Sequence, residues 1–175
     1  MKTMKELILG GARSGKSALA QQRAEQSGLT VIYIATASVL DEEMASRIAR
    51  HRQARPPAWQ LVEEPLALAR TLQASAAPDR CLLVDCLTLW LSNLLAENEA
   101  RLASEKHALL ETLPMLPGHL ILVSNEVGQG IVPTHPLARR FRDEAGWLHQ
   151  ALAHCCERVI LTVAGLPLIL KDIRL

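Results

Sequence analysis

The segment Gly10-Gly11-Ala12-Arg13-Ser14-Gly15-Lys16-Ser17 holds the residues whose types and spacing point most directly to chemistry. A glycine, four residues and then Gly-Lys-Ser form the phosphate-loop pattern, and an apolar run, residues 7–9, precedes it. Glycines let consecutive backbone N–H groups point at phosphate oxygens, and a following helix adds the positive end of its dipole. Lys16 would then place its charge on the β- and γ-phosphates, and Ser17 would be a Mg²⁺ ligand.

A Gly/Ser-rich turn with a solvated lysine is the alternative interpretation of this segment. The strand expected before it and the helix expected after it favour the phosphate loop. Such a loop implies a nucleoside triphosphate but does not choose between a kinase, a GTPase switch, a motor and a regulator. The chain has no Asn-Lys-x-Asp stretch and no obvious lid or effector segment. Phosphoryl or nucleotidyl transfer to a small molecule is therefore favoured.

Asp85 ends the apolar run Cys81-Leu82-Leu83-Val84. A carboxylate at the end of a buried strand is typical of a Walker B element, which holds Mg²⁺ directly or through water. The same aspartate could instead cap the helix expected to begin near Leu87, because aspartate is common at such junctions. The sequence leaves both roles open.

His51 differs from the other five histidines because it lies in a basic cluster, Arg47-Arg50-His51-Arg52-Arg55, at the end of a helix expected over 41–54. A neutral imidazole can attack phosphorus to give a covalent phosphoramidate, and nearby arginines would offset triphosphate charge. Cations that complement the C-terminal end of a helix dipole are the alternative explanation. Arg139, Arg140 and Arg142 raise the same question in a later helix, since they could face phosphate or solvent.

The elements that must position these residues alternate between strands and helices. Strands are expected over 7–9, 30–37, 59–62, 81–85, 120–124, 159–163 and 168–170. Helices are expected over 17–26, 41–54, 66–76, 87–113 with a break near 97–101, and 136–157. The pattern predicts one α/β domain over 1–175 with a mostly parallel sheet and a C-terminal edge hairpin. Ligands of such sheets bind beyond the carboxyl ends of the strands, where Gly10 and the small residues Ala35-Thr36-Ala37 would emerge.

Composition excludes several other classes. The formal net charge of +1 and the presence of only five aromatic residues give no support for nucleic-acid binding. No apolar run approaches the ~20 residues of a membrane span, and the N-terminus lacks a signal-peptide core. The four cysteines show no C-x-x-C spacing, so we expect reduced core thiols in a cytoplasmic protein.

Taken together, the segments resemble the bifunctional adenosylcobinamide kinase/adenosylcobinamide-phosphate guanylyltransferase family of cobalamin biosynthesis. The phosphate loop alone is generic, whereas the ordered set of the other segments is specific and covers nearly the whole chain. These segments are 33–37, Asp41-Glu42-Glu43-Met44, Arg47-Ile48, His51-Arg52, Arg55-Pro56, Trp59, Asp85-Cys86-Leu87-Thr88-Leu89-Trp90, Asn93, 124–133, Arg140-Phe141-Arg142-Asp143 and Gly146.

The resemblance implies that the aminopropanol hydroxyl of adenosylcobinamide is phosphorylated with ATP or GTP. GMP then passes from GTP through a guanylylated histidine to the phosphate, which gives adenosylcobinamide-GDP and pyrophosphate. It also implies a RecA-type phosphate-loop fold with three layers, and a homotrimer. Carried onto this sequence, residues 10–17 grip the triphosphate, Ala35, Thr36 and Ala37 line the nucleotide site, His51 is the nucleophile, and Arg52, Glu63 and Asp85 hold further nucleotide-site positions.

Some relatives carry two adjacent histidines where this chain has Arg50-His51, so His51 is the only candidate nucleophile at that place. Two other functions stay open at this level. A phosphate-loop kinase in which His51 is structural would transfer only the γ-phosphate. A nucleotide-binding regulatory protein would bind GTP and turn over no small substrate.

Overall fold

The part of the chain that the computed structural model describes, residues 4–37 and 56–173, contains one seven-stranded sheet in the order β3-β2-β4-β5-β1-β6-β7. Neighbouring strands are parallel except β6 and β7. The strands are β1 (Met4–Gly10), β2 (Thr30–Ala35), β3 (Gln60–Glu63), β4 (Arg80–Asp85), β5 (His119–Asn125), β6 (Arg158–Val163) and β7 (Leu166–Asp172). The predicted mostly parallel α/β sheet is confirmed.

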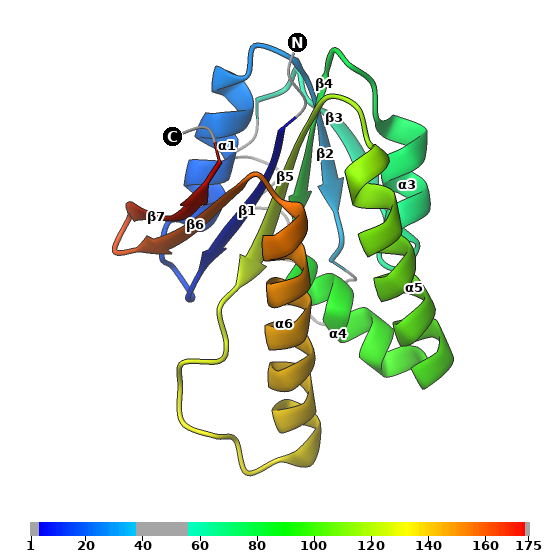
Figure 1. Ribbon diagram of the computed structural model, residues 1–175, viewed down its shortest axis with the longest axis vertical. Helices are drawn as coiled ribbons and strands as arrows, with labels where there is room; N and C mark the ends of the chain where they lie inside the picture. The colour runs from blue at the N-terminus through cyan, green and yellow to red at the C-terminus, as the bar shows by residue number, and fades with distance from the viewer. Residues whose placement is uncertain (1–3, 38–55, 174–175) are drawn as a thin grey trace.

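Helices cover both faces of this sheet, as Figure 1 shows. They are α1 (Lys16–Gln26), α3 (Leu68–Ser75), α4 (Leu87–Glu97), α5 (Glu99–Thr112), the 3₁₀ turn η1 (Leu113–Met115) and α6 (Pro136–Cys155). α1 packs on β1, β4 and β5 on one face, whereas α4 and α6 contact β5 and β1 from the other. The described elements therefore form the three layers that the resemblance implies.

Successive side chains of each buried strand point to opposite faces of the sheet and so contribute to the hydrophobic core on both faces. In β1, Leu7 and Leu9 belong to the larger apolar cluster, which α3 to α6 cover, while Ile8 belongs to the smaller cluster beneath α1. α1 contributes only small buried side chains, Ala20 and Ala24, so it can lie close to the sheet. A parallel sheet covered on both faces needs such near-continuous apolar strands.

The predicted break in the long helical region occurs at Asn98. Its side chain accepts a hydrogen bond from the Arg101 backbone N–H at 2.9 Å and so caps α5. The helix expected over 41–54 lies outside the described residues.

All four cysteines are free, and burial raises the pKa of the Cys81 and Cys156 thiols to about 12. None of the helices in the described ranges combines the length and hydrophobicity that a membrane span requires.

The predicted C-terminal hairpin is confirmed at the edge of the sheet. Ala164 and Gly165 both have positive φ, 51° and 78°, as a two-residue turn between twisted antiparallel strands requires. Pro167 lies in β7, where the edge position tolerates its missing N–H. This turn also contacts the phosphate loop, as described next.

Candidate active site

The strand registers bring the residues predicted from the sequence together at the carboxyl ends of the parallel strands. Gly10 pairs with Asn125, and Ala35 pairs with both Glu63 and Asp85. β5 lies between β1, which leads into the phosphate loop, and β4, which ends at Asp85. The phosphate loop and both candidate carboxylates therefore follow the carboxyl ends of parallel strands, where α/β proteins bind ligands.

Gly10 is required by close packing inside the loop. A Cβ atom at this position would lie 2.3 Å from Ser14 Oγ and 2.8 Å from the carbonyl oxygen of Thr162. Gly15 adopts φ +94°, and its own Cβ would lie 3.1 Å from the Cα of Gly165 in the β6–β7 turn. The Gly165 N–H donates to the Ser14 carbonyl at 2.8 Å. The hairpin turn thus supports the loop from behind.

Lys16 and the start of α1 form the cationic side of this loop. The Lys16 Nζ donates a hydrogen bond to the Gly11 carbonyl at 3.0 Å. Within the described residues, no side chain caps the N-terminus of α1. Its first backbone N–H groups are therefore left for a ligand, and the helix dipole adds positive potential there. This is the arrangement that an anionic phosphate needs.

Asp85 and Ser17 provide oxygen donors of the kind that Mg²⁺ prefers. The Tyr33 hydroxyl donates to Asp85 Oδ2 at 3.1 Å and orients that carboxylate. The N-cap residue of α4 is Cys86, and among the described residues no side chain caps this helix. Asp85 therefore does not have the capping role that the sequence left open. No group of three or more potential metal ligands occurs in the described ranges.

The remaining predicted site residues differ in burial, and two of them lie outside the described residues. Glu63 is exposed at the end of β3. Thr36 is fully buried, and its hydroxyl donates to the Cys86 carbonyl at 2.6 Å, so it joins the ends of β2 and β4. Ala35 and Ala37 are half-buried beside it. His51 and Arg52 lie outside the described residues.

The three arginines at the start of α6 have roles that the sequence did not indicate. Arg139 donates to the Pro133 and Thr134 carbonyls, and Arg142 donates to the Gly128 carbonyl at 2.7 Å. Arg140 pairs with Glu99 of α5. These side chains hold a loop and a neighbouring helix.

The sequence analysis also did not predict a series of buried polar side chains that are hydrogen-bonded to one another at the end of β5. His149 Nε2 lies 2.8 Å from Ser124 Oγ, which lies 3.2 Å from Thr88 Oγ1. Thr88 Oγ1 accepts the Asn125 backbone N–H at 2.7 Å, and His149 Nδ1 lies 3.8 Å from Glu126 Oε2. Burial lowers the pKa of His149, against the opposing effect of the Glu126 carboxylate. One signal was available: position 149 falls on the apolar face that Ala145, Leu148 and Leu152 share in α6.

Comparison with known families decides among the activities that such a site could have. The profile of the family described as "Cobinamide kinase / cobinamide phosphate guanyltransferase" matches residues 6–170. The chain belongs to this family. The kinase and guanylyltransferase expectation drawn from the resemblance is thereby confirmed.

Curated relatives of this cobinamide kinase and guanyltransferase family match over nearly their whole lengths. The "Bifunctional adenosylcobalamin biosynthesis protein CobP" of Pseudomonas aeruginosa is 63% identical over 96% of this chain and 98% of its own. The "Bifunctional adenosylcobalamin biosynthesis protein CobU" of Escherichia coli is 39% identical over 94% of this chain and 98% of its own.

Solved structures agree on the fold. The RadB recombinase matches with a TM-score of 0.53 and 20% identity, over 90% of this chain and 73% of its own. A Pyrococcus horikoshii OT3 protein, PH0250, matches with a TM-score of 0.60 and 9% identity, over 97% of this chain and 87% of its own. The predicted phosphate-loop NTPase fold is confirmed.

Proposed function

We propose that this chain phosphorylates the aminopropanol hydroxyl of adenosylcobinamide and then transfers GMP from GTP to that phosphate through a guanylylated His51. The observation that carries the proposal is that the phosphate loop, Asp85 and Glu63 all lie at the carboxyl ends of strands in the same parallel sheet. Family membership supplies the corrinoid acceptor.

In the kinase step, the substrate hydroxyl oxygen attacks the γ-phosphorus of ATP or GTP and releases its proton to water. The bond between this phosphorus and the β,γ-bridging oxygen breaks, and the nucleoside diphosphate leaves with the electron pair. Lys16 and the backbone N–H groups of residues 10–17 hold the phosphates and offset their charge. Mg²⁺, held by Ser17 and Asp85, would offset further phosphate charge when bound.

In the guanylyl step, an imidazole nitrogen of His51 attacks the α-phosphorus of GTP, and pyrophosphate leaves. An oxygen of adenosylcobinamide phosphate then attacks the same phosphorus and displaces the histidine nitrogen. Arg52 is proposed to balance the charge of the nucleotide, and Ala35, Thr36, Ala37 and Glu63 to border it. The small side chains of Ala35 and Ala37 support this assignment because they leave space at the end of β2.

Two labels test the two steps separately. The protein is incubated with Mg²⁺ and GTP labelled at the α-phosphate, denatured, and assayed for protein-bound label that survives alkali and is lost in acid, as a phosphoramidate is. The His51→Ala variant should lose this label completely. The exposed His154 supplies a matched control, and His154→Ala should keep the label.

The γ-labelled nucleotide reports the kinase step on adenosylcobinamide. We expect His51→Ala to retain γ-phosphoryl transfer, and Lys16→Ala to lose it by 100-fold or more because the phosphate charge is no longer offset. Protein-bound α-label in His51→Ala would contradict the assigned nucleophile. Absence of α-label from the wild-type protein, with pyrophosphatase present, would leave a kinase without guanylyl transfer.

The proposal includes a homotrimer, as the resemblance implies. Exposed apolar side chains on the edge strand β7 support association between copies, with Leu166, Leu168 and Leu170 exposed by 71%, 55% and 55%. Light scattering on the purified protein measures the state directly, and a monomeric mass would refute it.

A further inference from the structure

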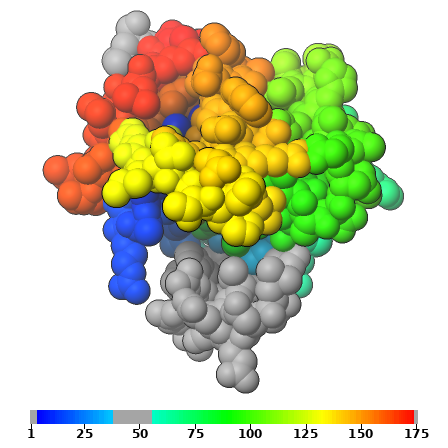
Figure 2. All heavy atoms as spheres, turned by 90° about the horizontal axis from the view of Figure 1, so that it is seen from below, coloured from blue at the N-terminus to red at the C-terminus, as the bar shows by residue number. Residues whose placement is uncertain are grey.

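The 126–135 loop, which connects β5 to α6, is anchored beside the phosphate loop. The Glu126 backbone N–H donates to the Gly10 carbonyl at 3.0 Å, so the loop begins in direct contact with the end of β1. Figure 2 views the molecule from the side at which the strand carboxyl ends emerge, and there the loop, in yellow, lies next to the blue N-terminal part of the chain. The start of this loop therefore lies next to the phosphate loop.

The farther part of the loop is strongly apolar although it faces solvent. Ile131 is 97% exposed and Val132 is 60% exposed, and Leu137 at the start of α6 is 54% exposed. Leu137 also lines a hollow of about 430 Å³ between α4 and α6, whose other lining residues are Ser92, Leu95, Ala96, His135, Ala138 and Phe141. Exposed apolar side chains and a mainly apolar concavity of this volume are typical of small-molecule sites.

The loop is held in place by polar contacts at its backbone. Arg142 donates to the Gly128 carbonyl, and Arg139 donates to the Pro133 and Thr134 carbonyls. These guanidinium groups fix the loop from the α6 side, and the exposed side chains at 131 and 132 are uncharged. This surface suits a ligand that presents apolar groups and does not suit a triphosphate.

The acceptor substrate has apolar groups of this kind. A corrin macrocycle carries methyl groups and uncharged amide side chains around its ring, and the hydroxyl to be phosphorylated lies at the end of a flexible aminopropanol arm. The ring can therefore bind at a distance from the phosphate loop while the arm reaches it. We propose that the 126–135 loop and the adjoining hollow bind the corrin ring of adenosylcobinamide. This inference rests on the proposed function and specifies the acceptor side of the same site.

The test separates corrinoid binding from nucleotide chemistry. Ile131→Asp places a charge on the apolar surface, and Ala138→Phe fills the hollow. We expect each variant to raise the KM for adenosylcobinamide at least ten-fold in the γ-phosphoryl transfer assay, and to weaken adenosylcobinamide binding in equilibrium dialysis by a similar factor. Self-labelling from α-labelled GTP needs no corrinoid and should stay within two-fold of the wild type.

Met115 provides the matched control because it is 81% exposed and lies just before β5, at the amino ends of the strands. Met115→Asp should leave the corrinoid KM unchanged. An unchanged KM in both loop variants, with the wild type active, overturns the inference and leaves the proposed function intact. A change of mass by light scattering in Ile131→Asp would identify the loop as a contact between copies and also overturn it. A wild-type protein that neither phosphorylates the corrinoid nor takes up label refutes the proposed function itself.

Discussion

At the scale of single residues, the phosphate loop depends on atoms that have no room to move. The Cβ that any other residue would add at position 10 meets Ser14 Oγ on one side and the backbone of β6 on the other. A serine hydroxyl can rotate away, but a strand carbonyl in the middle of a sheet cannot. Gly11, one position later, is exposed and has nothing within 4 Å of the equivalent point.

These two glycines give a matched pair of variants. Gly10→Ala should lower the free energy of unfolding by about 1–3 kcal/mol, the usual effect of overpacking. Gly11→Ala should change it by less than about 0.5 kcal/mol, as surface substitutions do. Urea unfolding of both variants in the absence of nucleotide measures the difference. Equal destabilisation by the two substitutions would show that packing around position 10 is not the cause.

The loop was predictable because its residues are contiguous, so the pattern contains the geometry. Tyr33 and Ser124 were not, because each acquires its role from a partner that is distant in sequence. Tyr33 contacts Asp85 across neighbouring strands, and Ser124 contacts His149 from the next helix. No spacing within one segment encodes such a pair. The sequence located the Asp85 carboxylate and left its orientation unknown.

At the scale of elements, His149 connects α6 to the end of β5 and to the start of the 126–135 loop. His149 of α6 contacts Ser124, the neighbour of Asn125 at the end of β5, and faces the Glu126 carboxylate at the start of the loop. With Nε2 accepting from Ser124, the Nδ1–H of the neutral imidazole points to Glu126. One side chain thus joins the helix, the strand and the 126–135 loop.

Because burial lowers the pKa of His149, the contribution of this residue to stability should fall in acid. The folded protein keeps the imidazole neutral where the unfolded chain already binds a proton. Stability is therefore full above the unfolded pKa of about 6.5 and falls as the pH drops towards the folded value, by at most about 1.4 kcal/mol per pH unit. His149→Gln should show a shallower loss between pH 7 and pH 5.

Urea midpoints across this range measure the two slopes. His154→Gln serves as the control, since His154 is exposed on the same helix and should leave the slope of the wild type unchanged. Parallel slopes for His149→Gln and the wild type would mean that His149 does not contribute the acid sensitivity.

Element boundaries show where sequence patterns are informative. Apolar periodicity located the buried strands, and the polar stretch near Asn98 marked the helix break. β1 nevertheless begins at Met4, three residues before the apolar run, and includes Lys5 and Glu6. Charged residues argue against a buried strand unless their partners are known, and those partners lie elsewhere in the chain.

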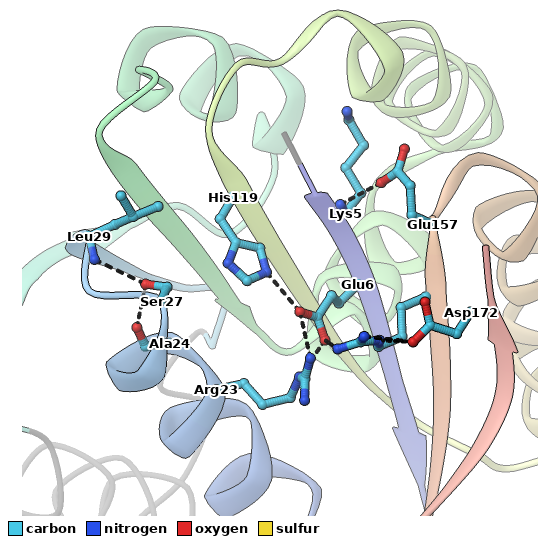
Figure 3. A network of polar contacts seen from close by, with 10 residues as sticks. Lys5, Glu6, Arg23, Ala24, Ser27, Leu29, His119, Glu157 and Asp172 are labelled. Carbon is cyan, nitrogen blue, oxygen red and sulfur yellow. Dashed lines mark hydrogen bonds and ion pairs between the residues drawn. The ribbon is translucent and has the colours of Figure 1, made fainter. Parts of the chain in front are cut away.

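At the scale of the whole molecule, Glu6 connects the layers at the amino end of the sheet (Figure 3). Its side chain is fully buried and accepts hydrogen bonds from Arg23 of α1 and from His119 Nε2 of β5 at 2.8 Å. Arg158 of β6 lies 4.0 Å away and also pairs with Asp172 of β7 at 2.6 Å. This carboxylate therefore joins the β1 strand that carries the phosphate loop to the helix, the neighbouring strands and the edge hairpin.

Burial opposes the ionisation of Glu6, but the hydrogen bonds and positive charges of His119 and Arg23 more than offset it and lower its pKa. A carboxylate with a lowered folded pKa contributes stability that is complete above the unfolded value, near 4.5, and is lost as the pH falls through the folded value. We expect Glu6→Gln to lose about 3 kcal/mol at pH 7, because it leaves Arg23 without its buried counter-charge, whereas Arg158 keeps its pair with Asp172.

The same substitution should remove part of the acid sensitivity, so the gap between Glu6→Gln and the wild type should narrow as the pH falls from 5 to 3. Urea unfolding at each pH measures this gap. Glu25→Gln, at an exposed position on α1, is the control and should follow the wild type at every pH. A constant gap would mean that the lost stability comes from side-chain shape. A narrowing gap ties it to the charge that holds β1 between its neighbours, and hence to the strand from which the phosphate loop emerges.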